Sequence, residues 1–232
     1  MQALDLYGTI EEYLDFHEEV RTLYSNILEA IIDKDISTII DIGCGQGDFC
    51  VLLGINGFQA YGVDLSQKQI EIAKKKDIDV ECIDIKDVKK KFQCATATFD
   101  VLNYIPPKEL QNFIQSTYDL LEENGYFVFD FNTLFGFEEI AQGTLSLDLE
   151  EKFIVIDANF DSDVLYTDMT VFTQENELYN KQSGTIEQYY HPKSLFIKIF
   201  KEVGFEVVDL IDVYLHNDEE ADKQIFLVKK GK

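Results

Sequence analysis

A glycine-rich segment near the start of the chain is the part best suited to binding a ligand. Its sequence is Asp41-Ile-Gly-Cys-Gly-Gln-Gly47, and it overlaps the end of a short β-branched run over residues 37–42. Glycine at 43 and 45 lets the backbone come close to a bound molecule. Asp64 lies 21 residues after Gly43, at the end of the next apolar run, where a carboxylate can bind two ribose hydroxyls. This spacing predicts a site for an adenosine-containing ligand.

Two carboxylates distinguish between the possible adenosine ligands. A dinucleotide fingerprint that starts at Gly43 would have Gly or Ala at position 48, but this chain has Asp48 there and Asp41 before the turn. Carboxylates at these positions repel phosphate and favour a ligand with positive charge, such as S-adenosylmethionine. At the end of a third apolar run, the Asp84 carboxylate can accept a hydrogen bond from the adenine amino group, and the Ile85 N–H can donate to the ring.

Four segments in this order resemble the class I S-adenosylmethionine-dependent methyltransferases, in their small-molecule branch. The segments are Asp41–Gly47, Tyr61–Ser66, Ile83–Ile85, and Thr98–Ile105 with the run that ends at Phe131. The resemblance implies a Rossmann-like sheet with S-adenosylmethionine as cofactor. It also implies cofactor contacts from the glycine segment, the ends of the next three strands and the N-terminal helix: Tyr13, Asp41, Gly43, Cys44, Gly45, Asp64, Leu65, Asp84, Ile85, Thr98 and Phe99.

Candidates for contact with a methyl acceptor lie further along the chain. A sulfonium is a good leaving group, so the protein mainly has to orient the acceptor and exclude water. Asn103 and Tyr104 follow the expected fourth strand, and the alternative is that they form a polar turn before the helix that starts at Pro106-Pro107. His191 is a candidate general base if the acceptor must lose a proton. The alternative for His191 is a surface or helix-capping residue.

The N-terminal region is expected to cover the ligand. Apolar residues recur at helical spacing from Ile10 to Asp33, which predicts one long amphipathic helix. Tyr7, Tyr13 and His17 could form a lid that excludes water. The alternative is that they only pack this helix against the sheet.

The elements that position these residues alternate between strand and helix. Strands are expected over residues 37–42, 59–63, 80–83, 92–98, 126–131, 205–213 and 224–228, and helices over residues 47–54, 66–76, 107–122 and 193–203. This order predicts a Rossmann-like three-layer α/β/α sandwich with a mostly parallel seven-stranded sheet and an antiparallel terminal hairpin. Between residues 144 and 190 the pattern has period two, which predicts an inserted antiparallel β meander. We therefore expect a methyltransferase domain over residues 1–143 and 191–232, with residues 144–190 as a substrate cap.

Composition restricts the partners. The chain has 232 residues with 20 Lys and Arg against 44 Asp and Glu, which gives a net charge of −24. Such a charge opposes binding to nucleic acid and to anionic membrane surfaces. No apolar run approaches the length needed to cross a bilayer. The four cysteines show no metal-ligand spacing, so we expect reduced thiols in the core, no bound metal and a cytoplasmic location.

These observations predict a methyltransferase that acts on a small-molecule acceptor, as a monomer or a homodimer. Two alternatives remain open at this stage. One is a protein methyltransferase with the same fold and cofactor. The other is a nonenzymatic S-adenosylmethionine-binding module whose inserted strands mediate association. Fold alone does not separate the three, because function resides in the acceptor site.

Overall fold

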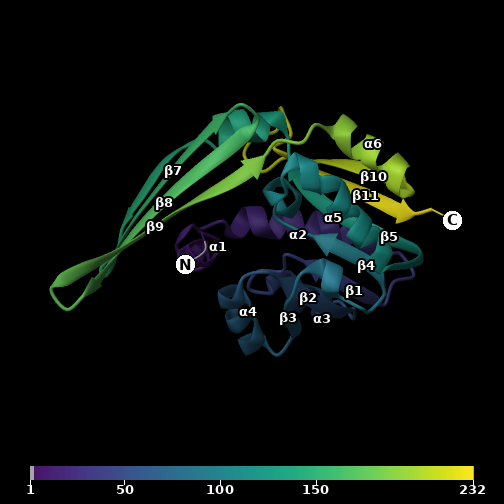
Figure 1. Ribbon diagram of the computed structural model, residues 1–232, viewed down its shortest axis with the longest axis horizontal. Coiled ribbons are helices and arrows are strands. Elements are labelled where there is room, and N and C mark those ends of the chain that lie inside the picture. Colours follow the sequence, from purple (N-terminus) through teal and green to yellow (C-terminus); the bar gives the residue numbers. More distant parts are fainter. Residues whose placement is uncertain (1–2, 232) are drawn as a thin grey trace.

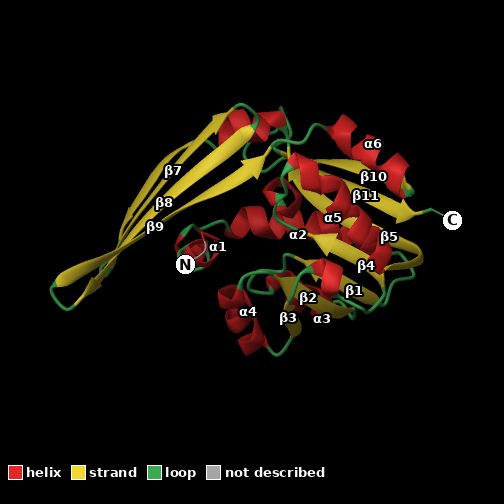
Figure 2. Ribbon diagram, viewed as in Figure 1, coloured by secondary structure: helices red, strands yellow, loops and turns green. Residues whose placement is uncertain are grey.

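A computed structural model describes residues 3–231 and contains two separate β-sheets. The larger sheet, with helices on both of its faces, forms the body of the molecule. The smaller sheet projects from the body (Figures 1 and 2). This two-part arrangement confirms the Rossmann-like fold and the antiparallel insertion predicted from the sequence.

The larger sheet has seven strands in the order β10-β11-β5-β4-β1-β2-β3. Strands β3, β2, β1, β4 and β5 run parallel, β11 is antiparallel to β5, and β10 is antiparallel to β11 and forms one edge. The strands are β1 (Thr38–Ile42), β2 (Gln59–Asp64), β3 (Asp79–Cys82), β4 (Phe92–Ala97), β5 (Leu121–Asn132), β10 (Phe205–Val213) and β11 (Lys223–Lys230).

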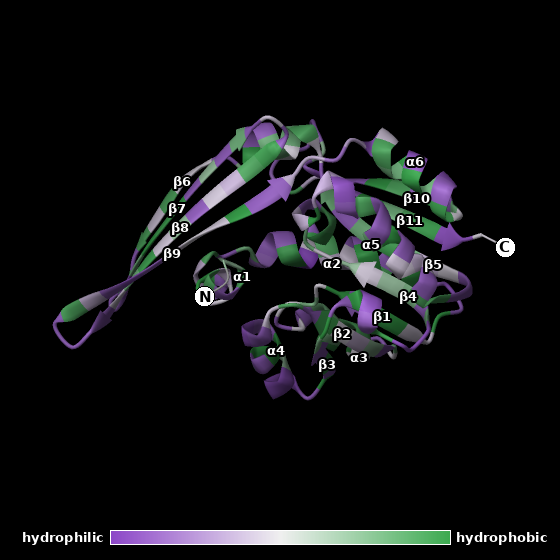
Figure 3. Ribbon diagram, viewed as in Figure 1, coloured by the Kyte–Doolittle hydropathy of each residue, from purple (hydrophilic) through white to green (hydrophobic). Residues whose placement is uncertain are grey.

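Helices cover both faces of this sheet because adjacent strand residues point to opposite sides. On β1, Ile39 belongs to the core that packs under α2 and α3, whereas Ile40 belongs to the core under α5 and α6. The flanking helices show both hydrophobic and hydrophilic stretches (Figure 3). Their bounds are α2 (His17–Ile32), α3 (Asp48–Ile55), α4 (Gln67–Ala73), α5 (Pro107–Leu120) and α6 (Lys193–Val203).

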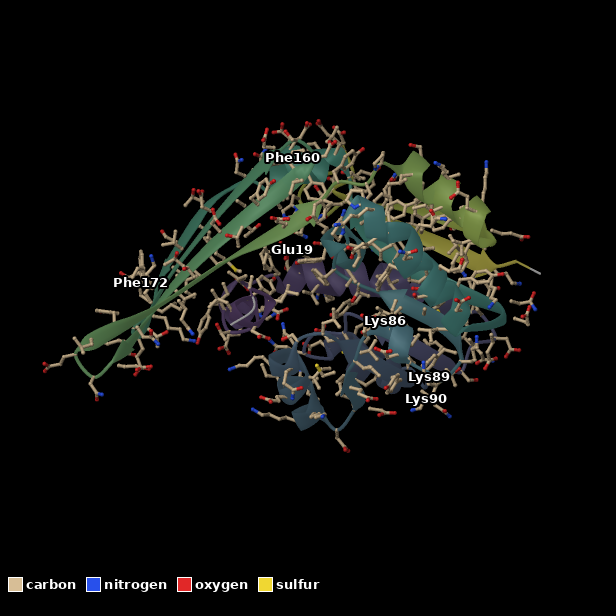
Figure 4. The ribbon with its side chains drawn as sticks, viewed as in Figure 1. Glu19, Lys86, Lys89, Lys90, Phe160 and Phe172 are labelled. Carbon is tan, nitrogen blue, oxygen red and sulfur yellow. The ribbon has the colours of Figure 1, made fainter. Side chains whose placement is uncertain are left out.

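The smaller sheet is an antiparallel meander in the order β6-β7-β8-β9. Its strands are β6 (Gly143–Asp148), β7 (Lys152–Asp161), β8 (Val164–Glu175) and β9 (Leu178–Tyr189). Phe160 lies at the end near the body, where its ring stacks on Phe137 with 5.1 Å between centroids, and Phe172 lies on the projecting part (Figure 4). One face of the sheet is apolar and forms a third core with the N-terminal segment.

The predicted single helix over residues 10–33 is wrong. The segment instead contains a 3-10 turn, η1 (Glu11–Tyr13), and then α2, with a left-handed residue, Asp15 (φ 49°), between them; a short helix, α1 (Ala3–Tyr7), precedes the segment. Leu6 and Ile10 pack on the antiparallel sheet, whereas the apolar face of α2 packs on the larger sheet. The chain changes direction between Tyr13 and His17 because the residues before this point pack in one core and those of α2 pack in another.

Other local predictions are confirmed. Gly47, in the left-handed region with φ 79°, precedes the first residue of α3, and Ser66 caps α4 by accepting a hydrogen bond from the Gln69 N–H at 3.2 Å. All four cysteines lie in the described part of the chain and are free thiols, but Cys82 is exposed rather than in the core.

Candidate active site

The glycine segment turns sharply where β1 ends. The N–H groups of Gly43 and Cys44 both donate to the Val63 carbonyl, at 2.8 and 3.0 Å, which attaches the turn to the end of β2. Gly43 has φ 71°, and a Cβ atom there would lie 2.6 Å from a Val101 methyl carbon. Only glycine is compatible with both the backbone conformation and the space. The turn is therefore held directly against the segment that follows β4.

Asp41 lies beneath this turn and has no exposed surface. Its Oδ1 accepts a hydrogen bond from the Thr96 hydroxyl at 2.8 Å, and its Oδ2 accepts a weaker one from the Cys50 thiol at 3.6 Å. Burial raises the pKa of Asp41 to about 7, although these two hydrogen bonds oppose the shift. Asp41 thus supports the turn from below. The sequence predicts that it contacts the methionine end of the cofactor, but its buried position favours a role in holding the turn in place.

Asp64 lies at the end of β2, as the sequence predicts. Its Oδ2 accepts from the Gly45 N–H at 2.9 Å and its Oδ1 accepts from the Ser66 N–H at 2.7 Å. Burial raises the pKa of Asp64 in spite of these bonds. Each carboxylate oxygen can accept a second hydrogen bond, so both remain suited to ribose hydroxyls. The neighbouring Leu65 is 64% exposed, as expected for a side chain that covers a bound ligand.

The end of β3 carries the predicted adenine contacts. Asp84 begins a short 3-10 turn, η3 (Ile85–Asp87), and its Oδ2 lies 2.8 Å from the Lys86 ammonium. Partial burial would raise the pKa of Asp84, but its hydrogen bonds and ion pair with Lys86 lower it below the usual value. The Asp84 carboxylate is therefore ionised at neutral pH and can accept a hydrogen bond.

A left-handed turn follows β4 next to the glycine segment. Thr98 is buried, and Phe99 and Asp100 both have positive φ, at 60° and 53°. The ring of Phe99 meets the edge of Tyr24 at 5.7 Å between centroids. Two consecutive left-handed residues other than glycine are strained, so other contacts must stabilise this turn.

A buried ionic cluster of Lys223, Asp100 and Asp130 supplies those contacts. The Lys223 ammonium pairs with Asp100 Oδ1 and lies 3.1 Å from Asp130 Oδ2, which also accepts from the Asp100 N–H at 3.0 Å. The two carboxylates raise the pKa of Lys223 even though burial acts in the opposite direction. Gln188 of β9 donates to Asp100 Oδ2 at 2.7 Å. The cluster therefore joins the β4 turn, β5, β11 and the smaller sheet.

Asn103 and Tyr104 lie in η4 (Val101–Tyr104), between the two sheets. The Asn103 amide is fully buried, donates to the Tyr189 carbonyl at 2.8 Å and accepts from the Asn132 N–H at 3.0 Å. This bonding favours the predicted alternative, in which Asn103 fixes the turn. Tyr104 lines a cavity of about 290 Å³, so it is the better placed of the two to contact an acceptor.

His191 is fully buried, so its predicted alternative as a surface residue is wrong. Its Nε2 lies 3.0 Å from the Ile105 carbonyl and 3.2 Å from the Leu102 carbonyl. Both partners only accept, so Nε2 carries the hydrogen. Burial lowers the pKa of His191. These contacts favour a role in fixing η4 over the predicted role as a general base.

The predicted lid residues separate into three environments. The Tyr13 hydroxyl accepts from the Lys152 ammonium at 3.0 Å, so this side chain faces the smaller sheet. His17 is almost fully exposed next to Asp15 and is not part of a lid. Burial, followed by the charges of Glu11 and Asp100, raises the pKa of Tyr7. Tyr7 alone is therefore enclosed beside the acidic groups of the cleft.

Glu11 is a site residue that sequence reasoning missed. Its Oε2 accepts from Gln46 Nε2 at 3.1 Å and from Gln69 Nε2 at 3.3 Å. Gln46 belongs to the glycine segment and Gln69 to α4, so Glu11 bridges the turn after β1 and the helix after β2. The only signal in the sequence was acidic composition near Tyr13, which does not specify a distant partner.

The comparisons with known proteins agree with this geometry. Residues 15–210 match a family model described as a methyltransferase domain. The chain belongs to this family of S-adenosylmethionine-dependent methyltransferases. YqeM of Bacillus subtilis (strain 168), which is named as a methyltransferase, is 25% identical over 206 residues, with 84% of this chain and 83% of that protein covered.

Two solved structures share the fold. An S-adenosylmethionine-dependent methyltransferase from Clostridium acetobutylicum ATCC 824 superposes with a TM-score of 0.81 at 21% identity, covering 98% of this chain and 100% of the other. The S-adenosylmethionine-bound CalS10, an amino pentose methyltransferase from Micromonospora echinaspora, has a TM-score of 0.69 at 15% identity, covering 93% and 92%.

The residues present fit S-adenosylmethionine. Asp64, Asp84 and the glycine turn lie at the carboxyl ends of neighbouring parallel strands, where such sheets bind ligands, and their carboxylates suit a cationic ligand. Within residues 3–231, no group of three or more His, Cys, Asp or Glu side chains is arranged to hold a metal ion. In the same range, no helix is long and apolar enough to span a membrane.

Proposed function

We propose that the protein transfers a methyl group from S-adenosylmethionine to a small-molecule acceptor held between the two sheets. The observation that carries this proposal is the cavity beside Tyr104. It has a volume of about 290 Å³ and is lined by Ala3, Leu4, Tyr104, Thr185, Ile186 and Glu187. These residues come from α1, η4 and β9, so the cavity lies where the donor side of the molecule meets the inserted sheet.

The size of this open hollow is compatible with a metabolite-sized acceptor. A volume near 300 Å³ is at the lower end of small-ligand pockets. The amino pentose methyltransferase among the structural neighbours also acts on a small acceptor, as its name states. Residues 144–190 then serve as the cap that supplies one wall of the acceptor site.

The chain's own residues would act by positioning. The bound cofactor supplies a methyl group on a positively charged sulfur, which leaves readily. Asp64 and Asp84 would hold the adenosine, the glycine turn would admit the methionine portion, and η4 would present Tyr104 to the acceptor. Aligning two reactants in this way accounts for up to about 7–11 kcal/mol of a barrier. The apolar wall formed by Ile186 and Leu4 would exclude water.

A substitution that fills the cavity tests the proposal. We expect Ile186→Trp to abolish transfer of labelled methyl from S-adenosylmethionine to the filterable fraction of a cell extract, with S-adenosylhomocysteine affinity unchanged. Tyr179→Trp is the matched control, because Tyr179 lies on the same strand but is 64% exposed. Label in the macromolecular fraction would instead indicate a protein methyltransferase, and full activity of Ile186→Trp would contradict the assigned acceptor cavity.

A cytoplasmic location and a monomeric or homodimeric state belong to the same proposal. Free thiols are typical of a reducing compartment, and three of the four in this chain are buried. The net charge of −24 opposes close packing of many copies.

A further inference from the structure

Glu11 connects the N-terminal segment to the candidate donor site. Its carboxylate bridges Gln46 of the glycine turn and Gln69 of α4, and both amides donate to the same oxygen, Oε2. Among the described residues, Oε1 of Glu11 accepts no hydrogen bond. The bridge joins the N-terminal segment to the glycine turn after β1 and to helix α4 after β2, so Glu11 lies next to the two elements that contact or follow Asp64.

The charge of Glu11 is not balanced by the protein. Within residues 3–231, no Lys, Arg or His lies within ion-pair distance of its carboxylate, and the cation that acts on it, Lys76, is already paired with Asp48 at 2.6 Å. Burial raises the pKa of Glu11, and the hydrogen bonds from Gln69 and Gln46 oppose the shift. Glu11 is therefore a half-buried carboxylate with amide donors and no paired cation, an environment that a cationic group would stabilise.

A second acceptor beside Glu11 also lacks a donor. Gln69 is 7% exposed, and its Oε1 has no hydrogen-bond partner among the described residues. A ligand group that satisfies both side chains must carry positive charge and several N–H donors. An ammonium group has both properties, with three donors. We propose that Glu11 and Gln69 bind the α-ammonium group of S-adenosylmethionine, with Glu11 supplying the opposite charge.

The position of Glu11 in the fold agrees with this assignment. Adenosine contacts lie at the ends of β2 and β3, so the methionine portion extends toward β1 and β4. The Glu11 carboxylate contacts Gln46 in the turn that follows β1, which places it at the β1 end of the donor site. Asp41, the other acidic candidate, is sealed beneath the turn with both oxygens hydrogen-bonded. The inference rests on the donor half of the proposed function and not on the acceptor cavity.

Two ligands that differ in the amino-acid portion test the assignment. S-adenosylhomocysteine contains the α-ammonium group, whereas 5′-methylthioadenosine has the same adenosine and sulfur without it. We expect Glu11→Gln, which keeps an oxygen for Gln46 and Gln69, to weaken S-adenosylhomocysteine binding at least about 30-fold. The affinity for 5′-methylthioadenosine should change less than about twofold. Glu12→Gln is the matched control and should leave both affinities unchanged.

The outcomes separate the possible failures. Equal S-adenosylhomocysteine affinity of the natural chain and Glu11→Gln would overturn the role of Glu11 alone. Equal loss for both ligands would assign Glu11 to loop closure and also overturn the proposal. If the natural chain bound neither ligand, both the proposed donor site and the role of Glu11 in it would be contradicted. Thermal unfolding of each variant without ligand confirms that the comparison is made on folded protein.

Discussion

The donor side and the acceptor side of the molecule are built in different ways. On the donor side, Asp41, Asp64 and Asp84 lie at or just beyond the ends of parallel strands. The first two are held by groups at the ends of neighbouring strands of the same sheet, as Asp64 is by the Gly45 N–H and Asp41 by Thr96. On the acceptor side, Tyr104 lies beside β9 residues that come more than 80 positions later in the chain, and the wall is completed by the N-terminal segment. Donor binding is therefore a local property of the fold, whereas acceptor binding depends on how two sheets are joined.

A substitution of Lys223 is the strongest test of the contacts that join the two sheets. We expect Lys223→Met to lower the free energy of unfolding by about 3–5 kcal/mol, because it leaves Asp100 and Asp130 buried without their cation. Urea denaturation of the variant and the natural chain measures the change. A loss below about 1 kcal/mol would show that the two sides are held together by other contacts. Lys198→Met, at an exposed ion pair, is the control.

Asp41 tests how the donor turn is supported. Its folded pKa is about 7 and its unfolded pKa is near 4, so the folded state holds an extra proton between these values. Its contribution to stability is fully present below pH 4 and is lost as the pH rises through 7, by on the order of 4 kcal/mol. We expect Asp41→Asn to flatten the decline in stability between pH 4.5 and 7.5. An unchanged slope in urea titrations would contradict the buried environment.

Asp64 tests the donor side alone. We expect Asp64→Ala to reduce S-adenosylhomocysteine affinity at least about 100-fold, because it removes the half-buried carboxylate that we propose binds two ribose hydroxyls. The rise in melting temperature that the ligand gives the natural chain should then disappear. A full shift in the variant would place the ribose elsewhere. Asp157→Ala, on the exposed face of the smaller sheet, should behave like the natural chain.

We expect the smallest effect on ligand affinity from a substitution of Asp84. Its carboxylate is partly exposed and already paired with Lys86, so we expect Asp84→Asn to weaken S-adenosylhomocysteine binding only about two- to fivefold. Titration calorimetry measures the difference. A loss as large as that of Asp64→Ala would mean that the two ends of the adenosine site contribute equally, contrary to their burial.

The same contrast explains what could be predicted from the sequence. The glycine turn, the Ser66 cap and Asp64 could be predicted because each belongs to a recognisable short pattern, although the hydrogen bond between Asp64 and Gly45 spans 19 positions. Lys223 could not be predicted, since its partner Asp100 is 123 positions away. The break between η1 and α2 was missed because apolar spacing predicts helix without showing that the two halves pack on different sheets. Glu11 was missed because it works through Gln46 and Gln69, which have no motif.

A crystal structure with S-adenosylhomocysteine bound tests the central claim most directly. We predict that the ribose hydroxyls lie on the Asp64 carboxylate, that adenine lies beside Asp84, and that the sulfur faces the cavity next to Tyr104. A ligand whose sulfur points away from that cavity, or whose ribose does not contact Asp64, would contradict the account.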